Sequence, residues 1–193
     1  MPQLYPTPRV FTPLAFYRHV VRAFRFFPHM LRSQRKGIVS KALNERIMLA
    51  VTEVNGCKYC SYYHTSLAIK AGITKSEIRA MRRGETQGIP EDENLAMVYA
   101  QHYADTGGNP EAETRNKLIE YYGLEKALGI EASIRSIMLG NIYGIAFDGL
   151  MRRLKGKRMK DSKLGYELGI FFGIFPMIPV ALVHSRFRSP SSL

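Results

Sequence analysis

Cys57, Cys60 and His64 are the residues whose types and spacing could do chemistry. Two residues separate the cysteines, so one sulfur can reach the other and close a disulfide. The thiolate is the reactive form of cysteine, and a free thiol is mostly protonated at neutral pH. At the start of a helix, unpaired backbone N–H groups and the helix dipole stabilise negative sulfur. The pair therefore predicts thiol redox chemistry if a helix begins at it.

His64 follows Cys60 by four residues, which places both side chains on one face of a helix. An imidazole in that position could take the thiol proton, directly or through a water. An acidic group on the preceding helix, Glu45 or Glu53, could orient the histidine. The sequence does not choose between these two carboxylates.

Two other interpretations of the cysteine pair are weaker. A closed zinc site needs four ligands, and only two cysteines and one histidine lie within reach, so we expect no metal. Inert, buried cysteines would not require a histidine at the next helical turn. We therefore expect catalytic cysteines that work without a cofactor.

The elements that must position these residues are helices. Helical periodicity, without strand-like alternation of useful length, predicts an all-α helical bundle. Asn55 and Gly56 should end one helix just before Cys57, so that the pair falls in the first turn of the next. Thr74 to Glu77 forms a capping box that should open another helix. The expected helices cover residues 14–27, 41–54, 57–71, 74–84, 90–105, 111–122 and 125–150.

The helices at either end of this series carry further signals. Pro28 should end or kink the first helix, which has one basic and one apolar face. Residues 1–13 are rich in proline and should form an irregular arm. Gly123 should separate the last two helices. The last helix places one stripe at core spacing: Ile130, Ile134, Ile137, Met138, Asn141 and Ile145.

Composition limits the class of protein. The chain has 193 residues, is 46% hydrophobic and carries a formal net charge of +12, which suits one domain with extra tails and predicts attraction to anionic partners. Two closely spaced cysteines do not make a secreted disulfide scaffold. The N-terminus lacks the charged-then-apolar order of a leader. We therefore expect a cytoplasmic protein.

The C-terminal segment differs from the rest of the chain. An apolar stretch, 165–183, contains Glu167, Pro176 and Pro179 as exceptions. A membrane-spanning helix needs about 20 apolar residues, so we favour docking of this stretch against the domain or a neighbouring subunit. The basic residues before it also fit an anionic lipid surface, which keeps membrane association open. These basic residues are Arg152, Arg153, Lys155, Lys157, Arg158 and Lys160.

These signals divide the chain into three segments: an arm with a basic and apolar helix (1–36), a redox domain (37–152) and a tail (153–193). A second hypothesis treats the protein as a non-catalytic module that associates with a membrane surface or with nucleic acid. Tyr59, Tyr62 and Tyr63 lack an accompanying basic run, so we interpret them as packing residues and expect no nucleic-acid partner.

The run NERIMLAVTEVNGCKYCSYYHTSLAIKAGI, residues 44–73, resembles the signature of the alkyl hydroperoxidase D-like family, also called the carboxymuconolactone decarboxylase family. That signature has a glutamate twelve residues before the first cysteine, then the cysteine pair, then a histidine four residues after the second cysteine. Glu45, Cys57, Cys60 and His64 match these positions. The resemblance covers about 43–84, continues weakly into the long helix and does not reach the tail.

The resemblance implies an all-α fold that commonly assembles as trimers or hexamers, so a homo-oligomer is expected. It also implies an antioxidant enzyme, a thiol-dependent peroxidase that reduces hydroperoxides. Cys60 would attack the peroxide, Cys57 would resolve the sulfenic acid to a disulfide, and His64 with Glu45 would form a proton relay. A dithiol partner, lipoylated or thioredoxin-like, would then reduce the pair.

One position departs from the peroxidase for which the family is named. That enzyme has a histidine just before the second cysteine, where this sequence has Tyr59. One proton-handling group is therefore missing. Thiol–disulfide exchange without peroxidase activity is the alternative function, and the decarboxylase reaction is not implied, because that branch typically lacks the cysteine pair.

Overall fold

The structure, a computed structural model, describes residues 7–83, 85 and 88–186. Within these residues it is built of helices and contains no strand, which confirms the predicted all-α class. The helices are α1 (Pro13–Lys36), α2 (Lys41–Asn55), α3 (Lys58–Lys70), α4 (Lys75–Arg82), the short 3₁₀ helix η1 (Glu91–Glu93), α5 (Asn94–Asp105), α6 (Ala112–Leu154) and α7 (Leu164–Arg186).

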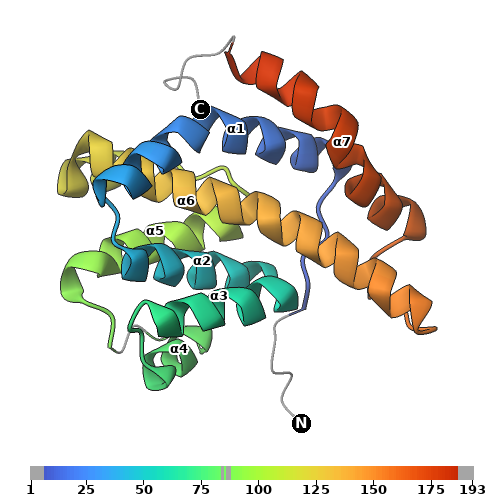
Figure 1. Cartoon of the computed structure of the whole chain (residues 1–193), viewed down its shortest axis with the longest axis horizontal. Helices are drawn as coiled ribbons and strands as arrows, with labels where there is room; N and C mark the ends of the chain where they lie inside the picture. The colour runs from blue at the N-terminus through green and yellow to red at the C-terminus, as the bar shows by residue number, and fades with distance from the viewer. Residues whose placement is uncertain (1–6, 84, 86–87, 187–193) are drawn as a thin grey trace.

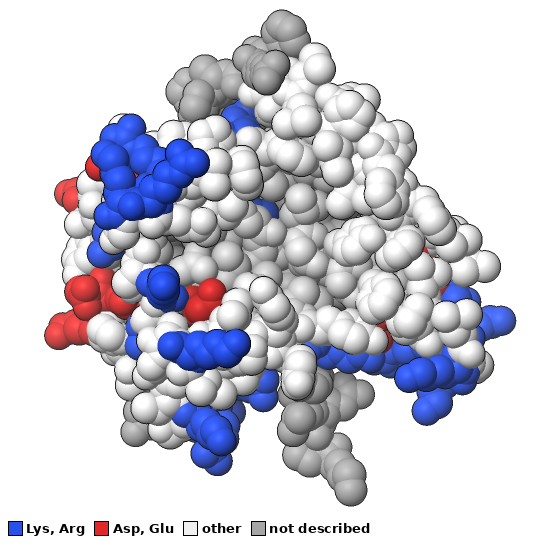
Figure 2. All heavy atoms as spheres, in the orientation of Figure 1, with Lys and Arg blue, Asp and Glu red and all other residues white. Residues whose placement is uncertain are grey.

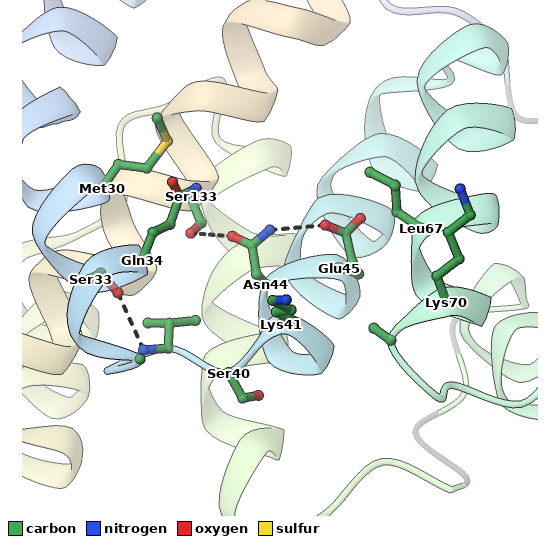
Figure 3. A pocket seen from close by; sticks show the side chains of 13 residues that line it. Met30, Ser33, Gln34, Ser40, Lys41, Asn44, Glu45, Leu67, Lys70 and Ser133 are labelled. Atoms are coloured by element: carbon green, nitrogen blue, oxygen red, sulfur yellow. Dashed lines mark hydrogen bonds between the residues drawn. The ribbon is translucent and has the colours of Figure 1, made fainter.

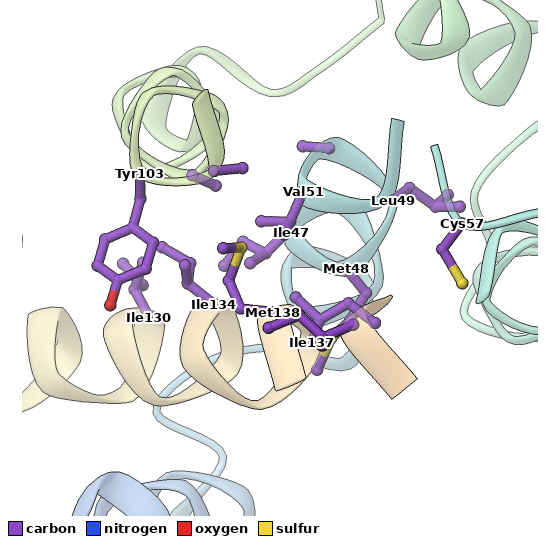
Figure 4. Packing of buried hydrophobic residues seen from close by; sticks show 14 of the residues in the cluster. Ile47, Met48, Leu49, Val51, Cys57, Tyr103, Ile130, Ile134, Ile137 and Met138 are labelled. Carbon is purple, nitrogen blue, oxygen red and sulfur yellow. The ribbon is translucent and has the colours of Figure 1, made fainter. Parts of the chain in front are cut away.

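Helix α6 is the central element of the bundle. It runs across the molecule and contacts α1, α2, α3, α5 and α7 (Figure 1). The core lies where α2, α5 and α6 meet, as the packing around Ile47, Tyr103 and Ile134 shows (Figure 4). The predicted stripe of residues on α6 is buried throughout, from Ile130 to Ile145.

The local signals around the cysteine pair are confirmed. Ser40 caps α2 through a hydrogen bond from the Leu43 N–H, and Gly56 ends α2 in the left-handed conformation, with φ 72°. Thr74 caps α4 as predicted by accepting from the Glu77 N–H. The expected end of α4 near Gly84 lies at the border of the described residues, because Gly84 itself is not described.

The prediction for Pro28 is wrong in one respect, since α1 does not end there. The helix continues to Lys36 and is capped by Gly37, with φ 64°. A proline inside a helix removes one backbone hydrogen bond. Pro28 is exposed, and its neighbour Phe26 is buried against the core, so the packing of α1 on α6 holds the helix together.

Gly123 separates two helical segments as predicted, although both are included in α6. Its φ of 75° and ψ of 157° are not helical, so the chain bends there between the expected segments 111–122 and 125–150. Of the expected irregular arm, residues 1–6 lie outside the described residues and 7–12 are not helical. Arg9 in this arm donates its backbone N–H to the Asn55 carbonyl, 2.9 Å away.

The apolar stretch 165–183 forms most of α7, whose described residues contact α1 and α6 (Figure 1). Ile170 and Ala181 are buried in these contacts. Pro176 and Pro179 lie inside the helix without ending it. Docking of this helix on the domain therefore occurs, and it covers one side of α7 only, because Phe172 and Phe175 on the other side are exposed.

Candidate redox site

The cysteine pair lies at the junction between α2 and α3. Gly56 ends α2, and Cys57 is the N-cap of α3, with extended backbone angles of φ −83° and ψ 96°. Its sulfur accepts a hydrogen bond from the Cys60 backbone N–H, with 3.3 Å between N and Sγ. Cys57 and Cys60 are joined by a disulfide. The first turn of α3 thus holds the pair where backbone N–H groups stabilise negative sulfur.

The two sulfurs differ in access. Cys57 is buried, with 2% of its surface exposed, whereas Cys60 is partly exposed. The carbonyl oxygen of Gly140 on α6 lies 3.6 Å from Cys60 Sγ. An approaching molecule therefore meets Cys60 first, whereas Cys57 is part of the buried hydrophobic cluster (Figure 4).

Gly144 on α6 makes room for the disulfide. A Cβ atom at this position would lie 2.7 Å from Cys57 Sγ and 3.1 Å from Cys60 Sγ. Both distances are shorter than an ordinary van der Waals contact. The missing side chain of Gly144 therefore allows α3 to bring both sulfurs against α6.

Glu45 is the carboxylate that orients the histidine. Its Oε2 lies 2.8 Å from His64 Nδ1, and both side chains are largely buried. The other candidate, Glu53, accepts a hydrogen bond from Ser61 Oγ instead and forms an ion pair with Arg82. Burial raises the pKa of Glu53, and the Ser61 hydrogen bond and Arg82 oppose that rise. The structure therefore resolves the choice that the sequence left open.

The Glu45–His64 pair continues into a chain of hydrogen bonds. The Asn44 amide donates to Glu45 Oε1 at 3.1 Å, and Asn44 Oδ1 accepts from Ser133 Oγ at 2.8 Å. Figure 3 shows the part of this chain that joins Ser133, Asn44 and Glu45. With Glu45 bonded to His64, four residues from α2, α3 and α6 form one connected polar chain. This chain fixes the carboxylate by bonds to both of its oxygens.

A cavity of about 560 Å³ lies beside this chain and contains Glu45 in its wall. Its lining comes from the end of α1, the start of α2, the end of α3 and α6, and it includes Asn44, Leu67 and Ser133 (Figure 3). Neither cysteine lines it. The cavity therefore reaches Glu45 and Asn44 and not the sulfurs.

Tyr59 lies between the cysteines and packs outward. Its ring contacts Phe147 of α6, with 5.4 Å between ring centroids, and the Lys58 ammonium lies 5.0 Å from its centroid. Lys58 also pairs with Asp148 on α6. Tyr59 therefore has aromatic and cationic neighbours. Among the described residues, no group of three or more His, Cys, Asp or Glu side chains could hold a metal ion.

The comparison with family models gives one match. Residues 20–90 match the carboxymuconolactone decarboxylase family, which includes the alkyl hydroperoxidase D-like proteins. Over this segment, the chain is similar to that family. The family segment contains Glu45, the cysteine pair and His64. Neither the comparison with curated proteins nor that with solved structures found a match.

Three residues that surround the candidate site were not identified from the sequence: Gly144, Asn44 and Ser133. Gly144 lies in the predicted α6 segment and follows Gly140 by four residues, so a pair of small residues on one helix face could have indicated a close approach. Asn44 and Ser133 gave no such signal, because single polar residues on a helix are common. Their roles follow from hydrogen bonds between separate helices.

Proposed function

We propose that the protein is a thiol-dependent peroxidase in which Cys60 attacks a hydroperoxide and Cys57 resolves the product. The observation that carries the proposal is the disulfide at the N-terminus of α3, together with the bonded pair of His64 and Glu45 one turn further on. The partial exposure of Cys60 and the burial of Cys57 favour this division of roles.

In the first step the Cys60 thiolate attacks the terminal oxygen of ROOH. An S–O bond forms, the O–O bond breaks, and the alkoxide takes a proton and leaves as ROH. Cys60 becomes a sulfenic acid, and its sulfur is oxidised by two electrons. In the second step the Cys57 thiolate attacks Cys60 sulfur, a disulfide forms, and hydroxide takes a proton and leaves as water.

His64 and Glu45 handle the protons of these steps. His64 accepts the proton of the Cys60 thiol, directly or through a water, and returns a proton to the leaving oxygen. Glu45 accepts a hydrogen bond from Nδ1 of His64. The other ring nitrogen of His64, Nε2, is therefore left to exchange protons. Asn44 keeps Glu45 in place by donating to its second oxygen.

An external dithiol closes the cycle, and a lipoyl group or a thioredoxin-like protein has the required chemistry. Its thiolate attacks the exposed Cys60 sulfur, and Cys57 leaves as a thiolate. The Cys60 N–H bonded to Cys57 Sγ stabilises that leaving group, which speeds the exchange. The second thiol of the reductant then releases Cys60, and the reductant leaves as its own disulfide.

The test is turnover of cumene hydroperoxide with dihydrolipoamide as the reductant. Cys60→Ser should abolish turnover, and Cys57→Ser should lose turnover while a dimedone-reactive sulfenic acid forms at Cys60. Ser66→Ala is the matched control, because Ser66 is an exposed residue of α3 whose hydroxyl bonds only its own helix among the described contacts. Wild-type cysteines that stay reduced in excess peroxide would refute the proposal.

A second candidate function is thiol–disulfide exchange with a protein or lipoyl partner. Tyr59 favours it, because this side chain packs against Phe147 where the family's named peroxidase has a proton-handling histidine. In this case dihydrolipoamide would reduce the disulfide of wild-type protein rapidly, while hydroperoxide would reoxidise the pair no faster than it oxidises free dithiothreitol. Comparison of these two rates on one preparation distinguishes the functions.

A further inference from the structure

The outward side of α7 is entirely apolar. From Leu164 to Val183, every exposed residue is an apolar side chain, glycine or proline. The most exposed aromatic side chains of α7 are Phe175, at 66%, and Phe172, at 59%. Leu164, Leu168 and Val180 extend the same surface along the helix. Soluble proteins rarely expose a continuous apolar surface of this kind unless something binds to it.

The inward side of α7 is fixed to the domain near both ends of the helix. Close to the first turn, Glu167 is fully buried, pairs with Arg153 and accepts a hydrogen bond from Ser162 Oγ at 2.7 Å. Close to the last turn, His184 Nδ1 and the Tyr17 hydroxyl lie 2.8 Å apart. These polar contacts hold both ends of α7 on α1 and α6. The outward side of α7 is therefore exposed to solvent along the whole helix.

Cations gather beside the N-terminal end of this apolar surface. Lys155, Lys157, Arg158, Lys160 and Lys163 are all exposed in the connection from α6 to α7, and Asp161 is the one acidic residue between them. In Figure 2 this group forms a basic edge, next to a broad area without charge that extends over α7. The surface thus combines an apolar strip with a positive border.

We propose that the outward side of α7 binds the surface of an anionic lipid bilayer, with the helix lying in the plane of the membrane. Its apolar residues would enter the boundary between headgroups and acyl chains, and the lysines of the α6–α7 connection would meet lipid phosphates. The charge of the border favours a bilayer over a second copy of the chain. An anionic bilayer offers phosphates to these lysines, whereas the outward side of α7 in a second copy offers only cations or uncharged residues.

The polar contacts of α7 favour the in-plane orientation over a spanning one. Leu164–Ser185 is long and apolar enough to cross a membrane by length and composition. Spanning would require the helix to leave α1 and α6, which would expose the buried Glu167 and separate it from Arg153. An unpaired carboxylate inside a bilayer is costly. The in-plane orientation keeps every one of these contacts.

The experiment is flotation of the full-length protein with vesicles of phosphatidylcholine alone or with added phosphatidylglycerol. We expect flotation with the anionic vesicles, more than thirtyfold weaker binding to neutral ones, and weaker binding as salt rises. Phe172→Ser/Phe175→Ser should abolish flotation. The matched control is Val98→Ser/Leu124→Ser, which changes two exposed apolar residues on α5 and α6 and should float like wild type.

Two further results decide between the partners. Lys157→Gln/Lys160→Gln should weaken binding to anionic vesicles about thirtyfold, as expected for the loss of two surface charges, and leave binding to neutral vesicles unchanged. The proposal is overturned if wild type binds both kinds of vesicle equally or neither. Self-association without vesicle binding, lost in the Phe172→Ser/Phe175→Ser variant, would assign this side of α7 to a second copy of the chain. Circular dichroism and thiol titration verify that each variant is folded.

Discussion

Two clusters in this molecule each contain one glutamate and one histidine, and they differ in what the glutamate binds. In the candidate site, Glu45 is bonded directly to His64. In the core, Glu131 is fully buried and accepts hydrogen bonds from Tyr99 and Arg115, with Arg135 as a second ion-pair partner. His19 lies near Arg135 in that cluster and is also buried.

In the proposed function, the same residue types serve structure in one place and proton transfer in the other. Arginine cannot give up its proton, so the carboxylate of Glu131 stays charged and its partners stay fixed. Burial alone would raise the pKa of Glu131, but Arg135 and Arg115 hold it below its ordinary value. Histidine, unlike arginine, can give up its proton, and the proposed function uses the Glu45–His64 pair for this purpose.

The largest expected effect is on stability, from removal of the core glutamate. Glu131→Ala leaves Arg115 and Arg135 without their common partner, and loss of one member of a buried ion pair costs about 3–5 kcal/mol. Thermal unfolding should therefore occur roughly 10 °C lower or more. Glu125→Ala is the control, because Glu125 is exposed and pairs with exposed Arg32 and Lys36, so its unfolding temperature should stay close to that of wild type. If both variants lose the same stability, the buried ion pairs of Glu131 contribute no more than the exposed ones of Glu125.

The second prediction concerns pH and the core histidine. Burial, with Arg22 and other cations nearby, lowers the pKa of His19 to about 4. The unfolded chain takes up this proton near its ordinary pKa of 6.5 and the folded chain does not, so stability is lost as pH falls from 6.5 to about 4. The shift corresponds to about 3 kcal/mol. Urea unfolding across this range measures it.

A matched pair of variants assigns this pH effect. His19→Gln removes the titrating group, so its stability should change much less between pH 6.5 and 4. His102→Gln is the control, because His102 is only partly buried and pairs with an exposed glutamate, Glu111, at the surface. Its stability should follow the wild-type pH dependence. If the His19→Gln curve also follows wild type, another group is responsible.

The third prediction moves to the candidate site, where the expected effect is on rate. Glu45→Gln keeps the shape of the side chain but loses the charge that stabilises a protonated His64, so turnover should fall about a hundredfold. Stability should change by less than about 1.5 kcal/mol. Glu53→Gln is the control on the same helix, because Glu53 bonds Ser61 and not His64, and its turnover should stay near wild type.

Much of this fold was predictable because local residues determine it. The caps at Ser40 and Thr74 and the left-handed Gly56 each need only neighbouring residues, and all three fix helix ends where expected. Pro28 shows the limit of such signals. It removes one hydrogen bond on an exposed face, and the packing of α1 against α6, which local sequence does not reveal, keeps the helix intact.

The candidate site was predictable to a similar depth. The spacing of Cys57, Cys60 and His64 places them on one helix, and the disulfide of the pair follows from that spacing. Both Glu45 and Glu53 lie on α2, so the local sequence does not show which of them meets His64. The packing of α3 on α2 brings His64 to Glu45 and Ser61 to Glu53. Gly144 comes from a helix more than eighty residues away in the chain, so its approach to the sulfurs depends on the packing of the whole bundle.

The smallest expected effect is on turnover, from changes at Asn44. It tests how Glu45 is held in place, which is the point at which the Glu45 and Glu131 clusters differ. Asn44 donates to Glu45 Oε1 and touches neither sulfur nor His64 among the described contacts, so we assign it a positioning role. Asn44→Ala should lower turnover about fivefold, close to the loss of one hydrogen bond, or about 1 kcal/mol. Asn44→Asp should be worse, because it loses the donor and adds a like charge beside Glu45.

The pH–rate profile separates positioning from simple structural support. In Asn44→Asp the added negative charge favours a proton on the neighbouring pair, so the acid limb of the profile should move to higher pH, whereas Asn44→Ala should scale the whole profile down. Ser133→Ala removes the hydrogen bond on the other side of Asn44 and should show a weaker form of the Asn44→Ala effect. A loss of stability in all three variants with unchanged turnover would make Asn44 a structural residue. The difference between Glu45 and the arginine-bound Glu131 would then depend on His64 alone.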